Sequence, residues 1–217
     1  MRFSLPFLAL TAFAPLVSVS AQTKSRPQSV PAPKTAPSKT ASKAKKPTKS
    51  PTEKRIDALW LQADAAFHKG DYARTIALNK QIVALDATET EAYSNGAWLM
   101  WSLGNGQQAL DFLARGLKAN PKNPEMWDVS AQHYDLQKRY SDSARAYAKA
   151  IEFSRPKPDQ MLRRRYAHAT ERVGNLSKSA EIWRALVADF PNEAVNKNNL
   201  ARVTKKMAIP APGSAIA

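Results

Sequence analysis

Histidine and cysteine patterns in the sequence give little support for metal or thiol chemistry. The 217 residues include three histidines, His68, His133 and His168, which lie far apart along the chain. None belongs to the His-Glu-x-x-His pattern that places two zinc ligands on one face of a helix. Cysteine is absent, which excludes disulfide bonds, thiolate metal sites and cysteine nucleophiles. We therefore predict no metal site and no cofactor.

Motifs for phosphate binding and nucleophilic catalysis are also missing. The sequence has no Gly-x-x-x-x-Gly-Lys-Ser/Thr loop to hold phosphate and no Gly-x-Ser-x-Gly turn to present a nucleophilic serine. No pair of carboxylates has the buried setting that acid–base catalysis requires. We predict that the chain is not an enzyme, has no small-molecule substrate and acts by binding.

The elements that position the polar and aromatic side chains form a repeating pattern. A short turn recurs at 70–72, 104–106, 138–140 and 174–176, at spacings of 34, 34 and 36 residues. A second turn, often with proline, closes each unit near 85–87, 119–121, 154–156 and 189–191. Two amphipathic stretches of about 13 residues lie between these turns. Each unit is therefore predicted to be a helix A, a tight turn and a helix B.

Small and large residues alternate in register across these units. The middle of helix A holds a small residue in every unit: Ala63, Ala97, Ala131 and Ala167. Helix B holds another: Thr75, Ala109, Ser143 and Ser179. A mostly bulky residue follows four positions later: Asn79, Leu113, Tyr147 and Trp183. Helices that pack 8–10 Å apart need small side chains where they cross, so the pattern predicts packed helical hairpins.

This pattern resembles the tetratricopeptide repeat (TPR), in units 56–89, 90–123, 124–157 and 160–193 of a domain spanning 53–193. The fourth unit departs from it, because Arg163 stands where the others have Leu59, Tyr93 and Trp127. The resemblance implies an all-α fold, a right-handed superhelix of about four helix-turn-helix units. Residues 194–207 are predicted to form a capping helix. Its apolar residues are Val195, Leu200, Val203 and Met207.

The first 52 residues are predicted to lie outside this fold. Residues 1–21 have the pattern of a signal peptide, with Arg2 before an apolar run and a cleavage site after Ala21. The run is shorter than the ~20 residues of a membrane span, so a signal anchor is the less favoured interpretation. We expect a secreted or periplasmic protein. Residues 208–217, with two prolines and small residues, predict a disordered tail.

Residues 22–52 predict a disordered, basic linker. They contain six prolines, seven lysines and Arg26 but no acidic or aromatic residue, so they cannot bury enough surface to fold. The net charge of +15 falls to about +6 when Arg2 and the eight linker cations are subtracted. Three roles stay open for the linker: a tether to an anionic surface, a solvated spacer, or a segment that occupies the protein's own acidic groove.

The TPR resemblance also implies where a partner binds. In this family the ligand groove is lined by helix A residues that point away from helix B. The segments 56–68, 90–103 and 124–137 contain six carboxylates and no Lys or Arg. An acid in the first turn of a helix is explained by the helix dipole. Asp64, Asp128 and Asp135 lie beyond the first turns, so the dipole does not explain them. The candidate groove residues are Trp60, Asp64, Phe67, Trp98, Trp101, Asp128, Gln132, Asp135, Arg164 and His168.

The predicted groove favours an extended or helical peptide with basic and apolar residues. One TPR subgroup binds acidic C-termini through Lys, Asn and Arg, but only Asn95 matches here, so that ligand class is rejected. The fourth unit reverses the charge, which would orient a bound segment. As an alternative function, the chain would bind an anionic polymer or acidic lipid surface through the linker and Arg163, Arg164 and Arg165.

Overall fold

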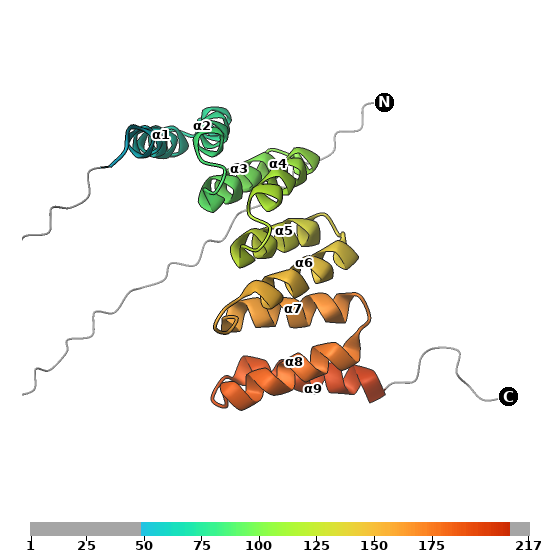
Figure 1. Ribbon diagram of the computed structural model, residues 1–217. Coiled ribbons are helices and arrows are strands. Elements are labelled where there is room, and N and C mark those ends of the chain that lie inside the picture. The colour runs from blue at the N-terminus through green and yellow to red at the C-terminus, as the bar shows by residue number, and fades with distance from the viewer. Residues whose placement is uncertain (1–48, 209–217) are drawn as a thin grey trace, which may run out of the picture. The chain divides into compact units, whose positions relative to one another are not determined.

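The computed structural model describes residues 49–208, which form nine α-helices and no strand in this range. Consecutive helices pack against each other in chain order (Figure 1). None of the helices in the described range is long and apolar enough to cross a membrane. The helices are α1 (Pro51–His68), α2 (Tyr72–Leu85), α3 (Thr90–Ser102), α4 (Gly106–Ala119), α5 (Pro124–Leu136), α6 (Tyr140–Phe153), α7 (Gln160–Arg172), α8 (Leu176–Asp189) and α9 (Ala194–Ala208).

Helix α1 begins earlier than the repeat register predicts. The hydroxyl of Ser50 accepts a hydrogen bond from the backbone N–H of Glu53, whose carboxylate accepts one from the backbone N–H of Ser50. Pro51 occupies the first helical position, where a missing N–H is tolerated. Pro51 and Thr52 therefore belong to the helix and not to the linker. The predicted signal peptide, residues 22–48 of the linker and residues 209–217 lie outside the described residues.

The turn between helices A and B depends on one backbone conformation. Gly70, Gly104 and Gly174 have φ angles of 74°, 83° and 80°, in the left-handed region that glycine adopts without strain. Lys138 holds the same position in the third unit with φ 59°. The recurring turn in the sequence is thus a helix C-terminal turn that reverses the chain.

The small residues of the repeat register lie at the helix crossings. Ala97, Ala131 and Ala167 are fully buried, and Ala63 is nearly so. The bulky helix B position is buried in all four units, including the polar Asn79. Gly116 allows an even closer approach, since a Cβ there would lie 2.9 Å from Cγ of Tyr93. The predicted packing positions are therefore where the helices touch.

The hydrophobic core is divided into three clusters along the chain. The first joins α1 to α5, the second α5 to α7, and the third α7 to α9. Arg163, the residue that departs from the repeat pattern, is buried, and its Nη1 lies 2.5 Å from Oδ2 of Asp189. An ion pair thus replaces the large apolar side chain that the other units place early in helix A. This segmented core is expected of stacked repeats, in which each unit contacts only its neighbours.

Helix α9 covers the last hairpin, but with a different face from the predicted one. Val203 is fully buried beside Trp183 and Leu186, whereas Val195 and Met207 are 47% and 42% exposed. Asn196 is buried instead, and its Nδ2 donates to the backbone carbonyl of Leu186. Positions 196, 200 and 203 lie on one face of the helix. Asn196 is therefore buried on that face, although Val195 is the more apolar residue.

Candidate functional site

Three adjoining cavities follow the A helices from α1 to α7 and end at α9. We name them the α1–α3 pocket, about 320 Å³, the α3–α7 pocket, about 610 Å³, and the α7–α9 pocket, about 360 Å³. Asn95 and Trp98 line both of the first two pockets, and Arg172 lines both of the last two. Because neighbouring pockets share lining residues, we describe the three together as the groove.

Trp98 is the most exposed aromatic side chain of the groove. It is 53% exposed, and its ring centroid lies 5.2 Å from that of Trp101, which packs partly buried against the first core cluster. Leu99 and Met100 are buried, as expected, but Leu103 is 49% exposed. Trp101 packs against the core, whereas Leu103 does not fill the core side as expected. Trp98 lines both of the first two pockets.

Seven of the ten predicted groove residues line a pocket. The α1–α3 pocket contains Trp60, Asp64, Phe67 and Trp98; the α3–α7 pocket contains Trp98, Gln132 and Asp135; and the α7–α9 pocket contains His168. The other three, Trp101, Asp128 and Arg164, do not line any of the three pockets. Arg164 is turned towards the end of the stack, where its guanidinium contacts Glu193 at 3.0 Å and Asn196 at 2.9 Å.

The middle of the groove is not acidic, contrary to the sequence-based prediction. Arg165 Nη1 lies 2.6 Å from Oδ2 of Asp128, and Arg172 Nη1 lies 2.5 Å from Oδ2 of Asp135. These arginines come from α7 and neutralise the two α5 carboxylates. Burial raises the pKa of Asp128, and the charge and hydrogen bond of Arg165 offset only part of that effect. The predicted acidic surface therefore survives only at the α1–α3 end.

His133 and Tyr147 line the α3–α7 pocket from positions that the sequence did not suggest. His133 is 3% exposed, and its Nδ1 has no hydrogen-bond partner among the described residues. Burial lowers the pKa of His133 to about 4, so the ring is neutral at physiological pH. Burial also raises the pKa of Tyr147, with nearby Asp135 and Asp128 acting in the same direction. Both groups are thus uncharged walls of the pocket.

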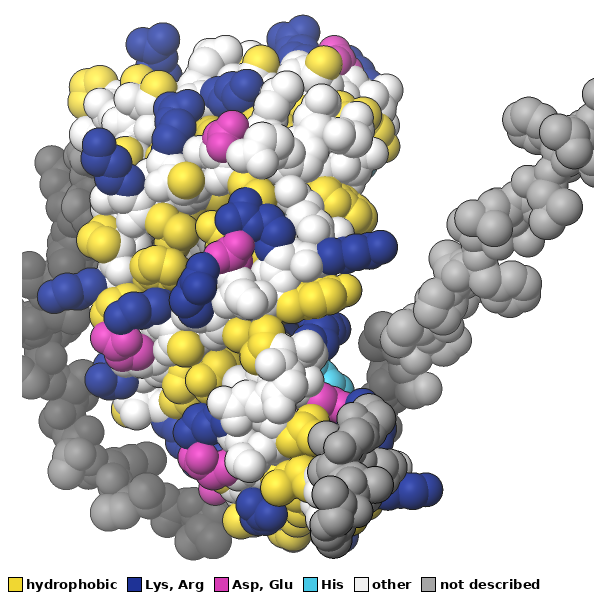
Figure 2. All heavy atoms as spheres, turned by 90° about the vertical axis from the view of Figure 1, so that its right-hand side faces the viewer, with side chains coloured by type: hydrophobic (Ala, Val, Ile, Leu, Met, Phe, Trp, Pro, Cys, Tyr) yellow, Lys and Arg dark blue, Asp and Glu magenta, His cyan; other side chains and the backbone are white. Residues whose placement is uncertain are grey.

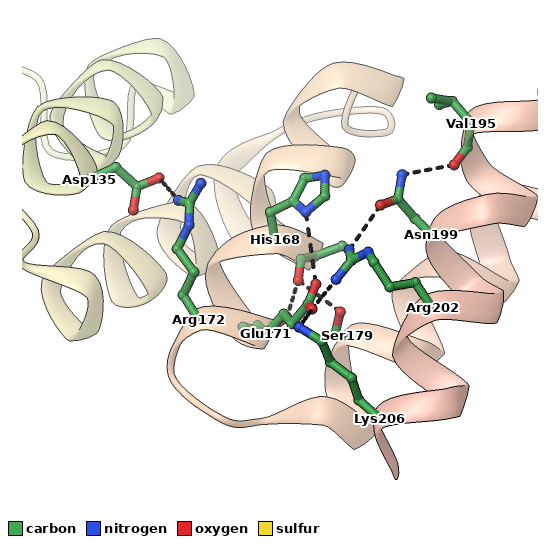
Figure 3. Close-up of polar contacts among 11 residues, drawn as sticks. Asp135, His168, Glu171, Arg172, Ser179, Val195, Asn199, Arg202 and Lys206 are labelled. Carbon is green, nitrogen blue, oxygen red and sulfur yellow. Dashed lines mark hydrogen bonds and ion pairs between the residues drawn. The ribbon is translucent and has the colours of Figure 1, made fainter. Parts of the chain in front are cut away.

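The α7–α9 pocket is organised around one carboxylate (Figure 3). Glu171 accepts hydrogen bonds from Arg202 and from Lys206, whose Nζ lies 2.7 Å from Oε1. Burial alone would raise the pKa of Glu171, but these bonds and their charges lower it to about 2. His168 Nδ1 is 3.9 Å from the other carboxylate oxygen. The network attaches α9 to α7 and closes this end of the groove.

The three consecutive arginines of α7 do not form one basic surface. Arg163 pairs with Asp189, Arg164 with Glu193 and Arg165 with Asp128, on three different elements. Figure 2 shows basic side chains scattered over the face it presents, with hydrophobic and acidic side chains between them. The arginine part of the predicted anionic-polymer site is therefore not supported, because each charge already has an internal partner.

Some lining residues come from helices that the groove prediction left out. Asn79 and Tyr147 belong to helices B and reach the groove from the bulky repeat position. A usable signal existed, since these two polar side chains stand where other units have Leu113 and Trp183. Arg202 and Lys206 come from α9, where their four-residue spacing places both on one face.

The groove offers surfaces for recognition. It combines exposed aromatic rings, the Asn95 amide and charged groups at both ends. Within residues 49–208, no group of three His, Cys, Asp or Glu residues is placed to hold a metal ion. The chemistry available along the groove is thus apolar contact, hydrogen bonding and charge pairing.

A stack of helical hairpins, with a groove along the first helix of each hairpin, is the architecture of α-helical repeat proteins. A family model described as tetratricopeptide repeat matches residues 66–132. The TPR resemblance predicted from the sequence is confirmed by this match and by the fold, and so is the predicted all-α superhelix of TPR units.

Solved structures share this fold at low sequence identity. The crystal structure of MamA protein is 12% identical, has a TM-score of 0.59, and the match covers 71% of this chain and 84% of that one. YrrB, described as a TPR protein with an unusual peptide-binding site, is 14% identical with a TM-score of 0.57. That match covers 73% of this chain and 84% of YrrB. A chain of the Naa15/Naa10 complex bound to HypK-THB is 16% identical with a TM-score of 0.55. That match covers 74% of this chain and 26% of the other. The curated proteins contain no match to this sequence.

Proposed function

We propose that this chain is a non-catalytic scaffold that binds a partner protein through a peptide segment lying in the groove. The observation that carries this proposal is the position of Trp98, a large aromatic side chain 53% exposed between two pockets. Exposed aromatic rings in a concave setting are typical anchor points for a partner side chain. Apart from its contact with the Trp101 ring, about half of the Trp98 side chain faces solvent, where it can contact a partner.

The comparisons support this class of function through the fold. YrrB is described as having a peptide-binding site, and the Naa15/Naa10 structure contains bound HypK-THB. The proposal for this chain also draws on its own features, namely the linked pockets and the charges at their ends. We expect an extended or helical segment that combines basic and apolar residues.

We further propose that the protein acts in the periplasm or the secreted space. The support is the sequence pattern of residues 1–21, with a charged start, an apolar run and small residues before Gln22. Mass spectrometry of the protein from its native envelope or medium tests this. A mature N-terminus at Gln22 is expected, and an intact Met1 on cytoplasmic protein would contradict export.

The groove is tested by capturing partners from an envelope extract with the full chain and with Trp98→Ala. Loss of a captured protein is expected in the variant, because it removes the exposed ring of Trp98, which is not itself part of a core cluster. Leu61→Ala is the matched control, since Leu61 is 74% exposed and does not line the groove. Trp101 is left intact because it packs against the core.

Equal capture by the Trp98→Ala and unaltered chains, with both folded by circular dichroism, would reject the groove as the binding surface. Capture that depends on the basic linker is the competing outcome. Binding of an anionic polymer would then weaken steeply and linearly with the logarithm of salt concentration. Binding through aromatic contacts should depend only modestly on salt.

A further inference from the structure

The α1–α3 pocket differs from the rest of the groove in its lining. Trp60 and Phe67 of α1 and Trp98 of α3 provide aromatic rings, and Asp64 and Glu91 provide carboxylates. The lining that residues 49–208 provide includes no Lys or Arg. Aromatic rings beside carboxylates form an environment that favours a cation, because the ring face and the acid both attract positive charge.

Among the residues that the structure describes, no arginine pairs with either carboxylate of this pocket, unlike the carboxylates of α5. In the described part of the chain, Asp64 has one possible ion-pair partner, His68, whose Nδ1 lies 3.4 Å from Oδ1, and both side chains are more than 70% exposed. Within residues 49–208, no basic side chain forms an ion pair with Glu91. Asp128 and Asp135, by contrast, are each paired with an arginine of α7. Within the described residues, therefore, no arginine or lysine neutralises the negative charge at the α1–α3 end.

An independent feature of the same pocket calls for a hydrogen-bond donor. Asn79 lines the pocket and is 1% exposed, and its Nδ2 donates to the backbone carbonyl of Thr75 at 3.0 Å. Its Oδ1 has no partner among the described residues. A buried acceptor without a donor destabilises the protein, so such a group indicates a missing ligand or water. A ligand N–H or a water molecule would complete it.

We propose that the α1–α3 pocket binds the cationic side chain of a lysine or arginine in the segment of the partner that occupies the groove. This inference rests on the proposed function and adds the chemistry of one subsite. The rings of Trp60 and Trp98 cover the methylenes and face the charge, Asp64 and Glu91 balance it, and Asn79 Oδ1 accepts an N–H. A cavity of about 320 Å³ has room for one such side chain with water.

The opposite end of the groove sets the direction of the bound segment. Arg172, Arg202 and Lys206 line the α7–α9 pocket with Glu171 as its one acid. A lysine of the partner is repelled there and attracted at the α1–α3 end. Charge complementarity of this kind selects orientation as well as partner. The partner's basic residue should therefore lie over α1 and α3, with its neutral or acidic part over α7.

The subsite is tested on the full chain with small probes, since the partner is unidentified. N-acetyl-lysine methylamide is titrated while the indole N–H signals of Trp60 and Trp98 are followed by NMR. N-acetyl-norleucine methylamide is the matched probe, because it keeps an alkyl chain and lacks the ammonium group. The lysine probe should shift these signals with a Kd in the millimolar range, at least about fivefold tighter than norleucine.

Variants separate the contributing groups. Asp64→Asn with Glu91→Gln should weaken the lysine probe about five- to tenfold at low salt, and Asn79→Leu about threefold or more. Asp111→Asn with Glu181→Gln is the control, because it removes the same charge from helices B outside the groove; its effect should stay below about twofold. Circular dichroism confirms that each variant is folded.

Equal affinity for the lysine and norleucine probes, or an Asp64→Asn and Glu91→Gln variant that binds lysine unchanged, would overturn the subsite. This failure is distinguishable from failure of the proposed function. If Trp98→Ala still abolishes partner capture while the lysine probe binds nowhere near Trp60, the groove remains the binding surface and only the cationic subsite is wrong.

Discussion

Arg172 of α7 contacts Asp135 of α5 at 2.5 Å, although 37 residues separate them in sequence. The Arg165–Asp128 pair repeats this contact seven residues earlier on both helices. The two pairs fasten α7 to α5 along the groove, close to where the core passes from one cluster to the next. They also remove the negative charge that α5 would otherwise present. The same contacts thus hold the stack together and set the electrostatics of the groove.

Breaking the inner pair should destabilise the fold. Arg165→Met leaves the partly buried carboxylate of Asp128 without its cation, and we expect a loss of about 1–2 kcal/mol in unfolding free energy. Urea unfolding at neutral pH measures it. Adding Asp128→Leu to the same chain should recover most of the loss, because no uncompensated charge then remains. A single variant as stable as the unaltered chain would mean that the pair contributes nothing.

Burial of His133 should make stability fall in mild acid. Its pKa is about 4 in the folded protein against 6.5 for an unperturbed histidine, so the unfolded chain binds the proton more readily. The stability contributed by the neutral ring is complete above about pH 6.5 and is lost as pH falls towards 4. We expect a loss of about 2 kcal/mol over this range, discounted for partial hydration of the site.

The matched variant for this effect is His133→Gln, which keeps a polar side chain without a titrating ring. Unfolding free energies at pH 7 and pH 4.5 are compared for both proteins, so that other titrating groups cancel. The drop should be smaller in the variant. An identical drop in the two proteins would show that His133 is not the group responsible.

The contacts of Glu171 with Arg202 and Lys206 should stabilise the packing of α9 against α7. Arg202 and Lys206 lower its pKa to about 2 from the usual 4.5, so its stabilising effect is present above pH 4.5 and disappears as pH falls towards 2. Glu171→Gln should cost about 1–3 kcal/mol at pH 7 and progressively less below pH 4.5. Hydrogen exchange of α9 provides a local readout. Faster exchange in α9 is expected at pH 7, and an unchanged α9 would contradict the assignment.

Replacing Lys138 with glycine should stabilise the folded protein. It has φ 59°, where the corresponding residues of the other units are Gly70, Gly104 and Gly174. Relief of this strain exceeds the added entropy of the unfolded chain, so Lys138→Gly should stabilise by about 0.5–1 kcal/mol. Lys80→Gly, in the interior of α2, is the control and should cost about 1 kcal/mol. Thermal unfolding measures both, and destabilisation by Lys138→Gly would show that its side chain contributes more than its backbone costs.

The fold could be predicted because its determinants are local. Glycine at the A–B turn, alanine at the helix crossings and a bulky residue in helix B repeat within about 34 residues. Each has a physical cause inside one hairpin or between adjacent ones. Arg163 breaks the pattern in sequence, yet its ion pair with Asp189 leaves the helix in place. Local pattern therefore identified the architecture even where one position departed from it.

The groove was only partly predictable. Trp60, Phe67 and Trp98 follow from the helix A register, which depends on helical periodicity alone. The charge of the groove does not, since Asp128 and Asp135 meet arginines from a helix one repeat further along. The unpaired acceptor of Asn79 and the rotation of α9 that buries Asn196 were likewise invisible. The sequence by itself determined the repeats and their aromatic surface. Tertiary structure decided which charges remain unpaired, because that depends on how neighbouring hairpins are rotated against one another.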